Sequence, residues 1–235
     1  MKIDWQDLPK LFPLYEDPGR WLQLLQRHAA LITDATPRVR VTSVPAGEVV
    51  RRHYAESLEL LRVLEVAGPI TAAVDVGSGG GYPGLVIAAV RDDAEIHLIE
   101  PLQKRARLLT ELADALGLKN VTVHAVRAED AGRSGLRDAS PVVTARAVAE
   151  LRVLLEYTAP LAADGGVIAL PKGSGLDEEL VACAHAMNEL GLEFESETPM
   201  RSEISETLRV ALFRKSGVTN ERYPRRPGMP AKHPL

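Results

Sequence analysis

Residues 72–84 read Ala-Ala-Val-Asp-Val-Gly-Ser-Gly-Gly-Gly-Tyr-Pro-Gly, and this stretch decides the fold. The apolar run 72–76 predicts a buried strand, and the helix-like segment 85–90 follows the glycines. Glycines adopt positive φ and let a ligand approach the backbone closely, while a helix start offers free N–H groups. We therefore expect a nucleotide-like cofactor to lie over residues 77–82.

The glycines fit two patterns. Residues 79–84 satisfy the dinucleotide fingerprint G-x-G-x-x-G, which is a weak signal alone because glycine is abundant here. Residues 75–81 satisfy D-x-G-x-G-x-G, which is typical of enzymes that bind S-adenosylmethionine. The second pattern also accounts for Gly77, which the first leaves out, and for an acid at a fixed offset. A glycine-rich turn without any ligand is the third interpretation.

Composition limits the class of protein. The chain has 235 residues, 46% of them hydrophobic, which suits one globular domain with an extension. Its net charge of −4 excludes a generic polyanion binder, yet residues 214–235 carry six basic side chains and one acidic side chain. A basic end on an acidic body indicates a local contact, for example with phosphates.

The lone cysteine, Cys183, excludes an internal disulfide and a metal cluster of the cysteine type. The first seven residues carry charges where a signal peptide needs an apolar stretch, and no apolar run approaches the ~18 residues of a membrane helix. We therefore expect a cytoplasmic protein that needs neither a membrane nor a metal.

The pattern of the chain changes near residue 70. Residues 1–69 predict a helical N-terminal extension, with helices over 18–32 and 47–66 and a short extended piece over 39–44. Alternating segments follow. The predicted strands are 72–76, 95–100, 121–126, 141–145 and 167–170, and the predicted helices are 83–91, 102–117, 147–160 and 176–190. Such alternation is typical of a parallel sheet covered on both faces.

Two further strands, 193–197 and 208–213, have no long helix between them and predict an antiparallel hairpin that closes the sheet. A class I methyltransferase sheet ends this way, whereas a doubly wound dinucleotide sheet does not. We predict an α/β Rossmann-like fold over 70–216 with a mostly parallel seven-stranded sheet and an antiparallel last strand. Residues 217–235 contain four prolines and predict an extended basic tail rather than a packed element.

Ligands of open α/β sheets bind at the carboxyl ends of the strands. Glu100 ends the second strand, 19 residues after Gly81, where a carboxylate can accept both ribose hydroxyls. It can also be a helix-capping acid, and NAD enzymes use the same position. After the third strand, Ala128 and Glu129 can hold an adenine edge or belong to a solvated acidic loop.

Two cations follow later strands, Arg146 after the fourth and Lys172 after the fifth. A charge at the mouth of a parallel sheet is unusual unless it is paired. Its partner would be a carboxylate or a substrate phosphate. By contrast, His53, His97 and His124 stand isolated in the sequence, and we expect core or surface positions for them.

Several segments together resemble the RsmG (GidB) family, the small-subunit ribosomal RNA methyltransferase G. The Tyr-Pro-Gly after the glycine loop and the Arg-Arg-Pro-Gly of 225–228 are the specific parts, since generic methyltransferases lack both. The resemblance covers nearly the whole chain. The matching segments are 52–58, 74–84, 100–105, 127–129, 144–147, 172–173, 223–228 and 230–232.

The resemblance implies methylation of N7 of one guanine in small-subunit ribosomal RNA with S-adenosylmethionine as the cofactor. Arg146 would lie where the cofactor meets the target base, and Arg146 and Lys172 are the expected catalytic residues. The expected cofactor-binding residues are Gly77, Ser78, Gly79, Tyr82, Glu100, Ala128, Glu129 and Arg146. The expected RNA clamp consists of Arg222, Arg225, Arg226 and Lys232.

Guanine N7 carries a lone pair and no proton, so positioning and charge stabilisation matter more than a general base. We expect a monomer whose partner is ribosomal RNA or a ribosomal subunit precursor. The chain departs from the family pattern at Arg40 and at Pro171. Three alternatives stay open: an NAD-dependent oxidoreductase, a small-molecule methyltransferase, and a non-catalytic RNA-binding protein.

Overall fold

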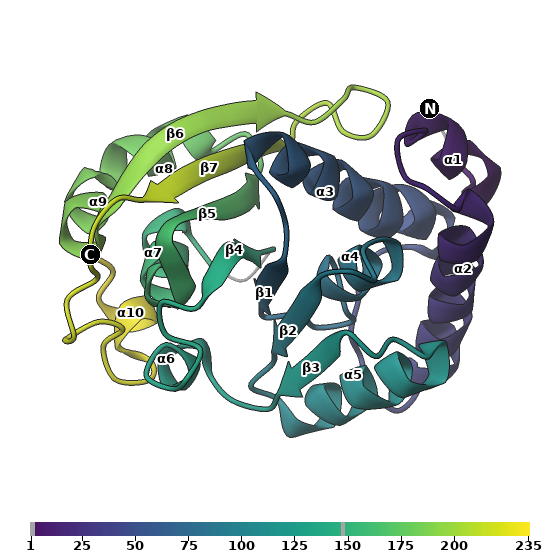
Figure 1. Ribbon diagram of the computed structural model, residues 1–235, viewed down its shortest axis with the longest axis horizontal. Helices are drawn as coiled ribbons and strands as arrows, with labels where there is room; N and C mark the ends of the chain where they lie inside the picture. The colour runs from purple at the N-terminus through teal and green to yellow at the C-terminus, as the bar shows by residue number, and fades with distance from the viewer. Residues whose placement is uncertain (1–2, 147–148) are drawn as a thin grey trace.

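A single seven-stranded sheet organises the molecule (Figure 1). The computed structural model describes residues 3–146 and 149–235. The strands follow the order β3-β2-β1-β4-β5-β7-β6; β7 runs antiparallel to both of its neighbours, and the other neighbouring pairs are parallel. The predicted Rossmann-like sheet is therefore confirmed. Its strands are β1 (Ala72–Val76), β2 (Glu95–Ile99), β3 (Val121–His124), β4 (Ser140–Ala145), β5 (Ala162–Lys172), β6 (Leu192–Pro199) and β7 (Arg209–Lys215).

Strand β5 is much longer than the predicted 167–170. Its first residues include Asp164 and Gly165, which are poor strand formers, and its end includes Pro171, which cannot donate to a ladder. Pro171 nevertheless lies opposite Val210 of β7. The proline therefore leaves the strand intact and carries it on to Lys172 at the edge where the site lies.

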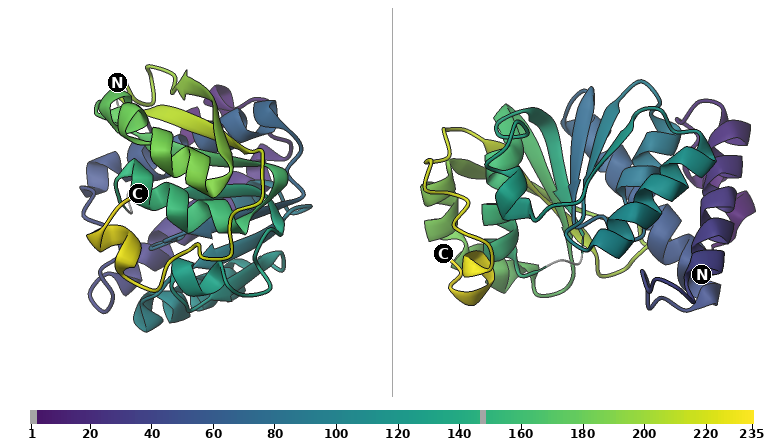
Figure 2. Two further views of the ribbon diagram at one scale, coloured as in Figure 1. Left: turned by 90° about the vertical axis from the view of Figure 1, so that its left-hand side faces the viewer. Right: turned by 90° about the horizontal axis from the view of Figure 1, so that it is seen from below.

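Helices cover both faces of the sheet, as the view from below shows (Figure 2). Two buried apolar clusters form, one on each side, because side chains alternate along a strand: Ala73 of β1 packs on one face, and Val74 and Val76 pack on the other. The predicted segment 176–190 is two helices interrupted at Cys183. The layers contain α3 (Glu56–Ala67), α4 (Gly84–Val90) and α5 (Gln103–Leu116) on one face, and α7 (Leu151–Thr158), α8 (Leu176–Ala182) and α9 (Ala184–Leu190) on the other.

The N-terminal extension adds an outer layer. Helix α2 (Pro18–Ala35) buries Trp21, Leu25 and Ile32 and contacts α4 and α5. The predicted segment 47–66 begins in a 3₁₀ turn (Ala46–Glu48) and continues as a π-helix (Val50–Ala55) before α3, and residues 39–44 form no strand. Shorter elements are α1 (Leu8–Leu11) and the 3₁₀ turns Trp5–Asp7, Ala46–Glu48 and Ala159–Leu161. The division at residue 69 remains an interpretation.

The expectation of an unpacked C-terminal tail is wrong. Tyr223 is buried, and the guanidinium of Arg225 holds the fully buried carboxylate of Glu156 on α7 with contacts from 2.5 to 3.1 Å. The short helix α10 (Met229–Lys232) then lies beside α6 (Ala128–Ala131) and α7 (Figure 1). Residues 147–148 of the predicted helix 147–160 lie outside the described residues. No helix in the described part of the chain is long and apolar enough to cross a bilayer.

Candidate active site

The glycine loop follows β1, and its backbone takes a conformation that favours glycine at three positions. Gly77, Gly79 and Gly81 have φ values of 76°, 56° and 90°, which other residues rarely adopt. Asp75 Oδ2 accepts a hydrogen bond from the Gly84 N–H at 3.0 Å, and burial raises the pKa of this carboxyl to about 6. Because glycines have no side chain, the backbone of this loop is accessible at the sheet edge where ligands of this fold class bind.

A buried chain of hydrogen bonds through His28, Tyr54 and Tyr82 holds the glycine loop in place. His28 Nε2 donates to the Gly80 carbonyl at 2.9 Å, so its Nδ1 accepts from the Tyr54 hydroxyl at 3.0 Å. The Tyr54 oxygen in turn accepts from the Tyr82 hydroxyl at 3.2 Å. Burial lowers the pKa of His28 to about 4, which keeps the ring neutral. The N-terminal extension therefore fixes the glycine loop.

Glu100 combines the two roles considered from the sequence. Its carboxylate is buried beside the loop; Oε2 accepts from Gly79 N at 3.1 Å, and Oε1 accepts from Leu102 N, just before α5, at 2.9 Å. A carboxylate has about four acceptor positions, so these two contacts leave room for ribose hydroxyls. The side chain is held in place for such a contact.

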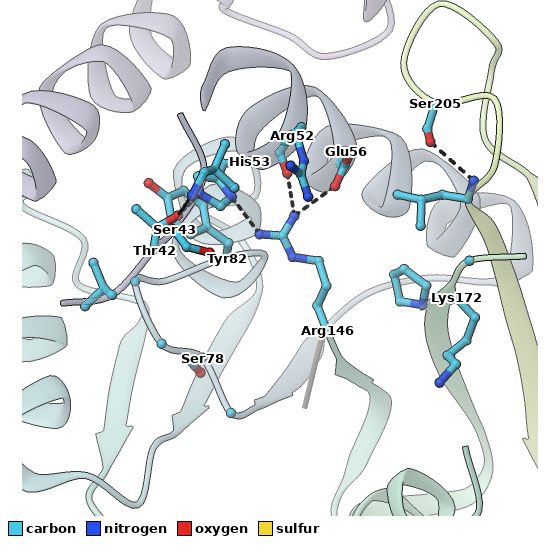
Figure 3. Close-up of a pocket in the computed structure, with 18 of the residues that line it drawn as sticks. Thr42, Ser43, Arg52, His53, Glu56, Ser78, Tyr82, Arg146, Lys172 and Ser205 are labelled. Carbon is cyan, nitrogen blue, oxygen red and sulfur yellow. Dashed lines mark hydrogen bonds and ion pairs between the residues drawn. The ribbon is translucent and has the colours of Figure 1, made fainter. Parts of the chain in front are cut away.

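Arg146 lies at the centre of the site and points from the end of β4 toward the π-helix of the extension (Figure 3). Its Nη1 donates to the Arg52 carbonyl at 2.9 Å and pairs with Glu56 Oε2 at 3.3 Å, while Nη2 donates to His53 Nδ1 at 3.0 Å. Burial raises the pKa of Glu56 to about 7, although the Arg146 charge opposes the shift. Of the two partners considered from the sequence, a carboxylate or a substrate phosphate, the structure shows a carboxylate, that of Glu56.

His53 is a site residue that the sequence reasoning missed. Because Arg146 can only donate, His53 Nδ1 accepts and Nε2 donates to Thr42 Oγ1 at 2.7 Å. Its ring stacks on Tyr82 with 4.2 Å between centroids, and burial lowers its pKa to about 3. The one sequence signal that could have found His53 was its place in the segment 52–58, which is among those that resemble the RsmG family. His97 and His124 are not isolated either, since Nδ1 of the first lies 3.1 Å from Nε2 of the second.

Arg146, His53 and the glycine loop line one cavity of about 970 Å³. Lys172 lines it opposite the loop (Figure 3), with Nζ 2.7 Å from Glu179 Oε2 and 3.3 Å from the Ala149 carbonyl. The structure thus brings the two expected catalytic residues to a single cavity. The other site residues on its wall are Arg40, Val41, Thr42, Arg52, His53, Glu56, Gly77, Ser78, Gly79, Tyr82 and Arg105.

Comparison with known proteins identifies the family. A family model described as GidB, rRNA small subunit methyltransferase G, matches residues 22–205. The chain belongs to this family. A ribosomal RNA small subunit methyltransferase G of Symbiobacterium thermophilum is 38% identical over 227 residues, which cover 93% of this chain and 92% of the relative. That of Carboxydothermus hydrogenoformans is 36% identical over 217 residues, covering 91% and 92%.

Solved structures agree on the fold of this GidB family member. A SAM dependent methyltransferase from Aquifex aeolicus matches with a TM-score of 0.55 and 14% identity, covering 80% of this chain and 98% of that one. M. jannaschii TYW2, solved in complex with AdoMet, matches with a TM-score of 0.53 and 17% identity, covering 69% and 75%. At these identities the likeness supports the architecture alone.

The remaining predicted cofactor residues of this chain, Glu100, Ala128 and Glu129, do not line this cavity. Ala128 and Glu129 begin α6 and are buried, and Glu129 Oε1 accepts a hydrogen bond from Gly228 N of the C-terminal segment at 2.8 Å. Neither residue, nor Glu100, is among those that line the cavity. The C-terminal segment therefore holds the carboxylate expected at the adenine end.

The four tail cations differ in availability. Arg225 is bound to Glu156 and to the His233 carbonyl, and Arg222 contacts Glu189. Arg226 and Lys232 are exposed, and among the described residues neither makes an ion pair. The structure does not bring these residues to the cavity. Their role in RNA binding remains a proposal, and the geometry favours Arg226 and Lys232 for it.

Proposed function

We propose that this chain transfers a methyl group from S-adenosylmethionine to N7 of a guanine in small-subunit ribosomal RNA. The observation that carries the proposal is the arrangement of the glycine loop and the Arg146 guanidinium on one cavity, in a chain that matches the GidB family over residues 22–205. Homologues named ribosomal RNA small subunit methyltransferase G support the substrate.

The residues present fit the cofactor. The loop presents bare backbone, Glu100 retains free acceptor positions, and the buried Oδ1 of Asp75 has no hydrogen-bond partner among the described atoms. When bound, S-adenosylmethionine supplies a methyl group on a positively charged sulfur. The residues that would hold it are Gly77, Ser78, Gly79, Tyr82, Glu100, Ala128, Glu129 and Arg146.

The residues around the cavity position the base rather than move its protons. Guanine N7 is a free acceptor, so the site needs no general base to prepare it. Arg146 has a guanidinium fixed by three partners, and such a preorganised donor suits the neighbouring O6 of guanine. Lys172, at the other side of the cavity, would attract a phosphate of an unstacked nucleotide.

The wider setting follows from this role. The RNA would bind as free ribosomal RNA or as part of a subunit precursor, in the cytoplasm, with a monomeric enzyme that needs no metal. Among the described residues, no group of three or more His, Cys, Asp or Glu side chains is arranged to hold a metal ion. Arg226 and Lys232 would add backbone contacts that weaken as salt is raised.

The test is a methyl-transfer assay with purified protein, unmodified small-subunit ribosomal RNA and a methyl-labelled cofactor. We expect label in one guanine, mapped by its sensitivity to cleavage at N7-methylated positions. Label in no RNA despite measured cofactor binding would refute the proposal. A parallel titration with NAD separates the oxidoreductase alternative, because only one of the two nucleotides should bind.

A further inference from the structure

The positively charged side chains around the cavity differ in whether a carboxylate pairs with them. Six arginine and lysine side chains line its wall, namely Arg40, Arg51, Arg52, Arg105, Arg146 and Lys172. Glu56 is the one acidic residue among the described residues that line it. Four of the six are paired with a carboxylate: Arg51 and Arg52 with Glu48, Arg146 with Glu56, and Lys172 with Glu179. Arg40 and Arg105 have no such partner among the described residues.

These two arginines are adjacent. Arg105 Nη2 donates to the carbonyl oxygen of Arg40 at 3.1 Å, although 65 residues separate them along the chain. Arg40 is exposed and Arg105 is half-buried, so both remain open to a large ligand at the edge of the cavity. The Arg105 guanidinium thus lies beside the Arg40 backbone, and an anion bound at this place would supply the counter-charge that both side chains lack among the described residues.

Local electrostatics do not favour a positive charge at Arg105. Arg105 lies in the first turn of α5, where the helix dipole disfavours a positive charge, and that turn contains no acidic residue. Some other arginines of this chain are neutralised, as the partly buried Arg209 is by Asp177 and Glu197. Among the cations that line the cavity, the two without a carboxylate partner in the described residues, Arg40 and Arg105, therefore lie on the same side.

Arg40 is held close to the glycine loop. A Cβ added to Gly80 would lie 3.4 Å from the Val41 Cβ, so the segment that carries Arg40 lies against the loop. Thr42, two residues after Arg40, accepts a hydrogen bond from His53, and His53 in turn accepts one from Arg146. A phosphate bound by Arg40 would therefore lie on the side of the extension, next to the place where the base must enter.

We propose that Arg40 and Arg105 form a phosphate-binding surface for the RNA backbone beside the target nucleotide. The inference rests on the proposed function and adds the extension to the substrate-binding surface. Guanidinium groups bind phosphate oxygens through two N–H donors at once, which suits them to this partner. The C-terminal segment packs on α6 and α7, and none of its residues lines the cavity.

The test compares RNA affinity and cofactor affinity in matched variants. The double variant Arg40→Ala/Arg105→Ala is measured beside Arg107→Ala, an exposed arginine on the same helix that does not line the cavity. A third variant, Arg226→Ala/Lys232→Ala, removes the open tail cations. The probes are an unmodified small-subunit ribosomal RNA transcript, titrated at several salt concentrations, and S-adenosylhomocysteine, titrated by calorimetry.

We expect the double variant to weaken RNA binding about tenfold or more, because each contact is a charge-assisted hydrogen bond. The slope of log affinity against log salt should fall by about 1.4, the value for two lost phosphate contacts to a single strand. Binding of S-adenosylhomocysteine and the melting temperature should stay at the wild-type values. Arg107→Ala should change none of these quantities.

Unchanged RNA affinity and salt slope in the double variant would overturn the inference, as would an equal loss in Arg107→Ala. Weakened S-adenosylhomocysteine binding with normal RNA binding would assign the two arginines to the cofactor instead and would also overturn it. Failure of the proposed function looks different, because the wild-type protein itself would then transfer no methyl group to the transcript.

Discussion

His28 Nε2 donates to the carbonyl oxygen of Gly80 across 2.9 Å, although the two residues are 52 positions apart. This bond joins α2 of the extension to the glycine loop of the sheet. Since His28 also accepts from Tyr54, a residue of the extension fixes both the loop and the tyrosine pair beside it. The extension therefore belongs to the binding site and is more than a cover for the sheet.

The buried His28 predicts a pH dependence of stability. Its folded pKa of about 4 lies below the unfolded value of 6.5, so its contribution is complete above pH 6.5 and is lost as the pH falls toward 4. At pH 5 this loss amounts to about 2 kcal/mol. His28→Gln keeps one donor and one acceptor but does not titrate.

The measurement is urea unfolding of both proteins at pH 7 and pH 5. We expect the wild-type protein to lose about 2 kcal/mol more than His28→Gln between these pH values. The comparison cancels other groups that titrate in the same range, among them Glu56 and Asp75, whose raised pKa values act in the opposite direction. Equal losses in the two proteins would show that His28 is not held neutral.

Arg146→Ala should lower the rate of methyl transfer about a hundredfold or more, the size of effect seen when one preorganised donor is removed. The variant also leaves the buried Glu56 without its guanidinium partner. Arg146→Lys, which keeps the charge but cannot reach the Arg52 carbonyl and His53 together, should recover part of the rate. A rate near wild type in Arg146→Ala, with normal cofactor binding, would remove Arg146 from the site.

Glu100→Ala should weaken S-adenosylhomocysteine binding about tenfold or more, because it removes the acceptor for ribose hydroxyls and frees the Gly79 N–H. The control is Glu95→Ala, an exposed carboxylate at the opposite end of β2. Calorimetry measures both affinities directly. Equal affinities of the two variants would leave Glu100 with its backbone contacts to Gly79 and Leu102 alone.

Local patterns predicted the sheet, since strands and helices depend on the spacing of nearby apolar residues. The rule that ligands bind at strand ends then placed Glu100, Arg146 and Lys172 at one edge. The partners of these residues were not predictable in the same way. Glu56 pairs with Arg146 across 90 positions, and Arg105 reaches Arg40 across 65, so no window of sequence contains both members.

The C-terminal segment shows the limit of composition as a guide. Its prolines and arginines read as an unpacked basic clamp, because nothing near them in sequence suggests an internal partner. The fully buried Glu156 lies 69 positions earlier and binds the Arg225 guanidinium, which is only partly exposed. A buried carboxylate on an ordinary amphipathic helix such as α7 carries no sequence signal of the arginine that it needs.

That pairing also changes the way in which the segment must be tested. Deletion of residues 217–235 would be a poor test of RNA binding, because it would remove the partner of Glu156 and free the carboxylate of Glu129. Arg225→Ala should lower the free energy of unfolding by about 3 kcal/mol, because one charge stays buried without the other. Arg226→Ala, one residue along and exposed, should leave it unchanged within about 0.5 kcal/mol. Denaturant titration of both variants measures the difference, and a similar stability in the two would mean that the C-terminal segment contributes nothing to the folded state through Arg225.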